Sequence, residues 1–180
     1  DRDVTRFKAI EAYSRRAIGA ESLRDFAETT VEAIVEAFEV ECSAMLTLDD
    51  TGRRLRVEAA FGLPQDAAGH CSLAVDWVAG RGLLGCDTAL IERVFPGSQP
   101  WSSLGLAQII LCPFADADGA FEGLLVGGVS AEKQAFYGEL GSELITSFVV
   151  FTEQVQSLLQ NLRSRKLIRQ QITTLGATNV

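Results

Sequence analysis

Two apolar segments joined by a tight turn constrain the fold of this chain more than any other feature of its sequence. Residues 106–112 and residues 120–130 are rich in apolar side chains, and the turn-forming pair Asp118-Gly119 lies between them. This pattern predicts two adjacent antiparallel strands. Residues 109–111 are apolar at every position, which predicts that the first strand lies in the interior of a sheet. We expect the glycines of the second strand to leave space against the sheet.

The segments before this pair show first helical and then strand periodicity. Residues 4–18 place apolar side chains on one side of a helix that Gly19 ends, and Ser22 begins a second helix with a capping-box pattern. Residues 42–48 and 54–61 alternate between inward and outward positions and predict a hairpin. Runs of strands separated from runs of helices predict an α+β fold, in which helices pack on one face of an antiparallel sheet.

The segment between the two strand pairs, residues 62–105, follows no single period. We expect short helices near residues 72–79 and 87–95, separated by glycines and bounded by Pro96. Irregular segments of this length are uncommon in compact domains unless they are functional or disordered. The longest helix is predicted from about Lys133 onward.

This order of elements resembles that of the GAF family of small-molecule sensor domains. The resemblance covers residues 20–160 and rests on the apolar strand pair, on Gly80-Arg-Gly-Leu-Leu-Gly85 and on the long final helix. It implies an α+β, GAF-like fold with an antiparallel sheet, helices on one face and long terminal helices. It also implies that residues 62–105 close over the sheet and form the ligand pocket.

The resemblance gives an expected organisation and function. Residues 1–19 would be a linker or dimerisation helix, residues 20–153 the sensor domain, and residues 154–180 a signalling or coiled-coil helix. We expect a non-catalytic, cytoplasmic domain of a longer bacterial signalling protein. It would bind a small ligand or sense redox state, and act on a covalently attached output domain. A dimerisation scaffold without a ligand, and an enzyme resembling free methionine sulfoxide reductase, are the alternatives.

Three glycines reproduce the spacing of the dinucleotide-binding fingerprint, at Gly80, Gly82 and Gly85. That fingerprint needs a preceding strand, a following helix and an acidic residue about 20 positions later. Positions 100–106 contain no acidic residue. We therefore interpret the glycines as a turn into a helix near residues 86–94, an arrangement similar to that of many GAF domains.

The charge distribution argues against a nucleic-acid partner. The net charge is −8, and it divides into −12 for residues 1–153 and +4 for the tail that follows. A body of that charge repels phosphate backbones. No apolar run approaches the roughly 18 residues of a membrane span, so no membrane partner is expected. The basic tail is interpreted as a solvated helix face.

The cysteines predict neither a metal site nor a disulfide framework. Cys42 and Cys112 lie in apolar strand patterns, where a thiol usually behaves as a small hydrophobe. The cysteine spacings match no metal-ligand motif, so we predict no metal and no catalytic residue. Cys71 and Cys86 flank the segment that the methionine sulfoxide reductases of the family use. Residues 96–105, however, lack that family's later nucleophilic cysteine.

The single histidine raises the question of a cofactor. His70 is followed by Cys71. In the bilin-binding members of the GAF family, which this chain resembles, the order is Cys-His and the pair lies within a helix. His70 would also be the only possible imidazole ligand for haem. The simpler interpretation is an exposed histidine beside an ordinary thiol, and the cofactor remains unknown.

The predicted ligand site lies between the sheet near Gln108 and Ile110 and the irregular segment from His70 to Ser103. Ligand pockets are mainly apolar and aromatic, with a few polar groups. The same aromatic residues could instead pack the short helices onto the sheet. The candidate ligand-binding residues are Trp77, Trp101, Phe95, Arg81, Ser102, Ser103, Gln108, His70 and Cys71.

The final helix carries a coiled-coil pattern. Phe151, Val155, Leu158 and Leu162 recur at alternating spacings of three and four. We expect this seam to be exposed and, together with residues 4–18, to form a homodimer through the terminal helices.

Overall fold

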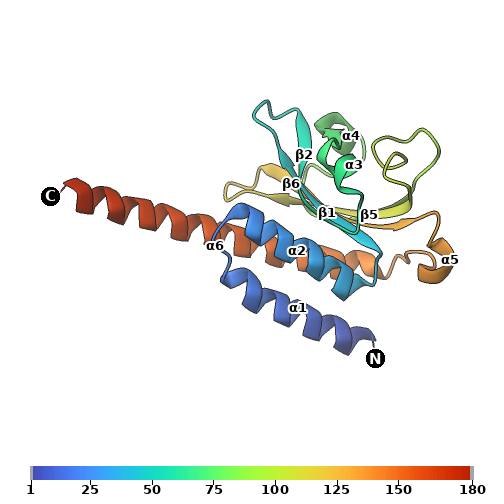
Figure 1. Ribbon diagram of the computed structural model, residues 1–180, viewed down its shortest axis with the longest axis horizontal. Coiled ribbons are helices and arrows are strands. Elements are labelled where there is room, and N and C mark those ends of the chain that lie inside the picture. Colours follow the sequence, from blue (N-terminus) through green and yellow to red (C-terminus); the bar gives the residue numbers. More distant parts are fainter. Residues whose placement is uncertain (1, 179–180) are drawn as a thin grey trace.

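The computed structural model describes residues 2–178, and these form one antiparallel sheet with helices on both of its faces (Figure 1). The elements follow one another as α1 Arg2–Ile18, α2 Leu23–Phe38, β1 Cys42–Leu48, β2 Arg54–Phe61, α3 Gln65–Gly69, β3 Ser72–Ala74, α4 Val75–Ala79, β4 Leu90–Arg93, β5 Leu106–Ala115, β6 Phe121–Ser130, α5 Gln134–Tyr137 and α6 Leu144–Thr178. None of the described helices is long and apolar enough to cross a membrane.

The six-stranded sheet has the order β3-β2-β1-β6-β5-β4, and every neighbouring pair is antiparallel. The β1–β2 and β5–β6 hairpins are both confirmed, and β5 lies in the interior as its apolar run predicted. Asp116 caps the β5–β6 turn, because its carboxylate accepts from the backbone N–H groups of Asp118 and Ala120 at 2.9 and 3.0 Å.

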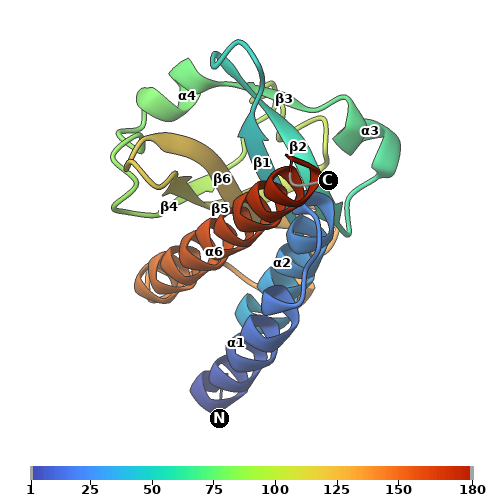
Figure 2. The same cartoon turned by 90° about the vertical axis from the view of Figure 1, so that its left-hand side faces the viewer.

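Helices α2 and α6 cover one face of the sheet, and α1 packs on their outer side; α3, α4 and the loops between β2 and β5 cover the other face (Figure 2). In Figure 1, α1 and α6 run in the same direction and α2 runs against them. Ser22 begins α2 as predicted, since its hydroxyl accepts from Asp25 N–H at 3.0 Å. The buried Tyr13 hydroxyl lies 2.8 Å from that of Thr30 and ties α1 to α2.

The glycines of β6 do not leave space for a ligand, contrary to the sequence expectation. The Phe114 ring occupies the position that a side chain at Gly123 would take, and Ile110 contacts Gly127 in the same way. On the other face, Leu106 lies against Gly128. The glycines therefore let large side chains of β5 cross over the neighbouring strand.

Two helix predictions are wrong in position. Residues 87–95, predicted as a helix, contain the edge strand β4, whose backbone pairs with Gln108–Leu111 of β5. The predicted long helix from Lys133 is divided, because Gly138 adopts a φ of +76° and ends α5 before α6 begins. The first error concerns a short strand that exists only through its pairing with β5, and the second concerns a helix end that a glycine determines locally.

The predicted exposed seam on α6 is also wrong. Phe151, Val155 and Leu162 are buried in the core beneath the sheet, because the spacing of three and four marks the face that contacts the domain itself. Apart from Val150, the exposed large apolar side chains of this helix lie farther along it, at Leu167, Ile168, Ile172 and Leu175.

The close approach of β6 to Phe114 predicts a large effect of a single methyl group. A Cβ at Gly123 would overlap the Phe114 ring and lie 2.5 Å from the Leu46 carbonyl oxygen. Gly123→Ala should lower the free energy of unfolding by about 2 kcal/mol. Gly69→Ala is the control, because a Cβ there meets open space. Equal denaturation midpoints for the two variants would contradict this packing.

Candidate functional site

The sheet face opposite the long helices is filled by the protein's own side chains. Residues 62–105 do close over this face, as the family resemblance implied, and they bury Val78, Leu83 and Trp101 against it. The Trp101 side chain is 1% exposed, and its ring centroid lies 5.6 Å from that of Trp77. The two predicted tryptophans therefore contact each other and close the centre of this face.

Arg81 lies beside these tryptophans, and its guanidinium is bound by other side chains of the protein. Its guanidinium carbon lies 3.5 Å from the centroid of the Trp77 ring, a cation–π contact. Its Nε and Nη2 donate to the two carboxylate oxygens of Glu92 at 2.8 and 3.0 Å. These contacts hold α4 against β4.

One buried donor on this face has no acceptor. The Nε1–H of Trp101 finds no hydrogen-bond partner among the described residues. Buried polar groups are nearly always paired with protein or water, and no described residue serves as the acceptor for this N–H.

A groove remains at one edge of this face. It has a volume of about 480 Å³ and lies between the α3–β3 segment and the loop that precedes β5. Three of the predicted residues, His70, Cys71 and Ser103, line it. The other lining residues are Arg54, Ala67, Ser72, Gln99, Pro100 and Leu104.

The lining of the groove has an apolar part and a polar part. Cys71 and Leu104 are each 8% exposed, whereas Arg54 and Ser103 are exposed. Arg54 Nε donates to Ser72 Oγ at 2.6 Å, and Arg54 Nη2 donates to the Ser72 carbonyl at 3.2 Å. These bonds link the first residue of β2 to the first residue of β3.

The loop wall of the groove is organised by the Gln99 side chain. Gln99 Nε2 donates to Ser102 Oγ at 3.1 Å, and the Ser103 hydroxyl donates to Gln99 Oε1. Ser102, a predicted ligand residue, is thus a neighbour of the groove that helps to hold its wall. On the opposite wall, His70 Nδ1 lies 2.7 Å from the Asp66 carbonyl oxygen, so Nδ1 is the donor.

Two predicted residues lie elsewhere. Phe95 and Gln108 line a different hollow of about 480 Å³, between β4 and α5. Gln108 Nε2 donates to the Gly138 carbonyl at 2.7 Å, and its Oε1 accepts from Leu140 N–H at 2.8 Å. Ile110 packs into the helix-side core. The expected site between Gln108, Ile110 and the irregular segment is therefore wrong, because these side chains point to the opposite face.

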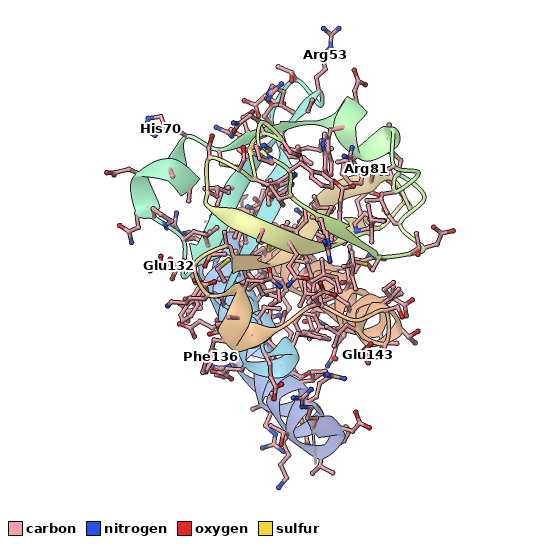
Figure 3. The ribbon with its side chains drawn as sticks, turned by 90° about the vertical axis from the view of Figure 1, so that its right-hand side faces the viewer. Arg53, His70, Arg81, Glu132, Phe136 and Glu143 are labelled. Carbon is pink, nitrogen blue, oxygen red and sulfur yellow. The ribbon has the colours of Figure 1, made fainter. Side chains whose placement is uncertain are left out.

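The nine predicted residues consequently fall into separate groups. Figure 3 shows His70 and Arg81 at opposite ends of the same face. Sequence reasoning missed Arg54, Ser72 and Gln99 in the groove. The only signal for Arg54 was its outward position in an alternating strand. Ser72 was missed because residues 72–79 were predicted as a helix, whereas Ser72–Ala74 form β3.

Burial keeps the thiols of this chain neutral. All four cysteines are free. Burial raises the pKa of Cys42 and of Cys112 to about 12, and that of Cys86 to about 11. It also raises the pKa of Cys71. Among the described residues, no group of three or more His, Cys, Asp or Glu side chains is placed to hold a metal ion.

Comparison with known proteins gives matches in structure. No protein-family model and no curated protein sequence matches this chain. The GAF domain of a phosphoenolpyruvate-protein phosphotransferase from Coxiella burnetii matches 91% of this chain and 98% of its own length, with a TM-score of 0.69 and 15% identity. A domain of a methyl-accepting chemotaxis protein matches 86% of this chain and 98% of its own, with a TM-score of 0.64 and 15% identity.

A larger photoreceptor contains the same arrangement. A bacteriophytochrome from the photosynthetic bacterium R. palustris matches 96% of this chain and 40% of its own length, with a TM-score of 0.73 and 10% identity. At these identities the likeness concerns the arrangement of helices and strands.

The raised thiol pKa values predict slow alkylation of the folded chain. The pKa of Cys86 is raised to about 11, so at pH 8 only about one molecule in a thousand carries the reactive thiolate. Iodoacetamide should react slowly at pH 8 and faster as the pH rises toward 11, at Cys86 first because it is half-buried. All four thiols should react at once in guanidinium chloride. A native thiol as reactive at pH 7 as free cysteine would instead favour redox chemistry.

Proposed function

Because this chain has a GAF-like α+β fold, as its sequence predicted, we propose that it is a non-catalytic sensory domain. It binds a small molecule in the groove between α3–β3 and the loop before β5, and it passes the resulting change through α6 to an attached output domain. The proteins of similar structure include chemotaxis and photosensory proteins, which supports a signalling role. The proposed location is the cytoplasm of a bacterium.

The observation that carries this proposal is the double role of α6. From Phe148 to Leu162 the helix supplies the core beneath the sheet, and the same helix continues to Thr178. The side chains of residues 166–176 are all exposed. This last part of α6 extends away from the rest of the domain (Figure 1). A single helix therefore joins the interior of the domain to a segment available for contact with another domain or subunit.

A homodimer through the terminal helices is part of the proposal. At 100° per residue, Val150, Ile168, Ile172 and Leu175 fall within about 60° of one another on α6. These four side chains are 54–64% exposed. On α1, Val4 and Phe7 are also exposed. A second copy of the chain would cover this stripe, which differs from the buried seam.

The same structure bears on two alternative functions, a dimerisation scaffold without a ligand and a thiol-dependent enzyme or redox sensor. The filled centre of the ligand face favours a dimerisation scaffold, whereas the groove favours a ligand sensor. The raised pKa values of the thiols disfavour thiol catalysis and thiol-based redox sensing, because both need a thiolate. Ligand sensing is therefore proposed ahead of redox sensing.

Retention of a small molecule tests the sensory role. The intact chain, incubated with a bacterial metabolite extract and examined by native mass spectrometry, should retain a small molecule. Ser103→Trp should abolish retention, because the larger side chain fills the groove. Glu132→Trp is the control, since Glu132 is exposed beside α5 (Figure 3). Retention that is unaffected by Ser103→Trp would place the ligand elsewhere, and no retention by any variant would favour the scaffold.

The exposed stripe of α6 predicts the effect of charge on self-association. The double variant Ile168→Glu with Ile172→Glu should weaken the dimer at least about tenfold, because it introduces carboxylates into an apolar interface. The control Gln170→Glu with Thr173→Glu adds the same charge on the other side of the helix. Sedimentation velocity measures both variants. A wild-type chain that remains monomeric at high micromolar concentration would disprove the dimer.

A further inference from the structure

We infer that the groove selects a small organic monocarboxylate with an apolar part, and that Arg54 binds its carboxylate. This inference rests on the proposed ligand-binding function and adds the chemical class of the ligand. It depends on the charge of the groove, on unused hydrogen-bond donors, and on the buried side chains in its lining.

The charge of this groove differs from that of three other hollows near the sheet. Its lining contains the cation of Arg54 and no aspartate or glutamate. The hollow between β4 and α5 contains Arg93 together with Glu139, and these two side chains form an ion pair. Two further hollows near β2 both contain Glu58 beside Arg24. In a chain of net charge −8, a groove free of carboxylates is suited to an anion.

Arg54 has donors available for that anion. Its Nε and Nη2 hold Ser72, whereas Nη1 and the second hydrogen of Nη2 have no partner among the described residues. These two N–H groups lie side by side at the end of the guanidinium and match the two oxygens of a carboxylate. Arg81 and Arg163, by contrast, are already paired with Glu92 and Glu122.

Further donors lie close to Arg54. The Ser72 hydroxyl accepts from Arg54 and keeps its own hydrogen for a ligand. Gln99 Nε2 gives one of its two hydrogens to Ser102 and keeps the other. His70 on the opposite wall holds the Asp66 carbonyl through Nδ1, which leaves its Nε2 without a partner among the described residues. Donors without acceptors favour a ligand that supplies oxygen atoms.

The remaining lining defines the rest of the ligand. Cys71 and Leu104 are nearly buried, and Ala67 and Pro100 add apolar surface beside them. A single guanidinium balances a single negative charge, which favours a monocarboxylate over a doubly charged phosphate. The volume of about 480 Å³ admits a small molecule rather than a peptide.

Hexanoate and hexanamide test this inference, because they share a chain length and differ in charge. Titrations of the intact ¹⁵N-labelled chain should show hexanoate shifting the backbone amide signals of residues 70–72, 99 and 101–104. Hexanamide should bind more weakly, and so should acetate, which lacks the apolar chain. Arg54→Gln should weaken hexanoate binding about tenfold, the effect expected for loss of a charged hydrogen-bonding partner.

Two further variants keep the result interpretable. Arg53→Gln removes the same charge one residue earlier, at the outer end of the β1–β2 hairpin (Figure 3), and should leave hexanoate binding unchanged. Arg54→Lys keeps the charge and should retain part of the affinity, even if Arg54→Gln disturbs β3. Equal loss in Arg53→Gln and Arg54→Gln would overturn the inference.

The two proposals fail in different ways. Hexanamide binding as tight as hexanoate, with the same amide shifts, would overturn the anion inference and leave the groove as a ligand site. If no probe shifts the amide signals of residues 70–72, 99 and 101–104, both the inference and the proposed site are overturned.

Discussion

The packing of two phenylalanines of α6 against the preceding helices holds the helical layer together. Phe148 and Phe151 are fully buried, and their rings lie 5.0 and 5.6 Å from that of Phe38 on α2. Phe151 also lies 5.2 Å from Tyr13 on α1. Truncation of a buried phenylalanine to alanine typically costs about 3–5 kcal/mol, against a typical total stability of about 5–15 kcal/mol. Helices α1, α2 and α6 therefore depend on one aromatic cluster and are attached to the sheet as a unit.

The opposite face of the sheet determines where a ligand can bind. The tryptophan pair, Leu83 and Val78 fill the centre of that face, and the Arg81–Glu92 ion pair holds the covering segment in place. The space that remains lies at the β2–β3 edge, where β3 is only three residues long. The groove thus results from incomplete cover of the sheet edge, and its polar groups come from the ends of short elements.

The sequence predicted the elements whose signals are local. The Asp118-Gly119 turn predicted the β5–β6 hairpin, and Ser22 predicted the start of α2. Strand β4 could not be predicted, because its four residues have no period and exist as a strand only through pairing with β5. Neighbouring residues of a strand point to opposite faces, so Ile109 and Gln108 lie on different faces of β5, but the apolar run of residues 109–111 did not tell which face the long helices cover. For the same reason the groove was predicted only in part: His70 and Ser103 lie in the irregular segment, whereas Arg54 belongs to another hairpin.

A continuous set of contacts connects the groove with α6. Arg54 begins β2, β2 pairs with β1, and the Ser43 hydroxyl of β1 donates to the Val31 carbonyl of α2 at 2.5 Å. Helix α2 then meets α6 through Phe38. At the far end of its buried part, α6 is held by an ion pair between Arg163 and Glu122 of β6.

The exposed end of α6 would amplify a small movement. From residue 163 to Thr178 the helix extends by about 22 Å, at 1.5 Å per residue. Under the proposed function, a tilt of about 5° at the Arg163–Glu122 contact would displace the far end by about 2 Å, a shift comparable to helix movements at the subunit interfaces of allosteric proteins. A rearrangement confined to side chains at the β2–β3 edge would then suffice to change what the tail of α6 presents to a partner.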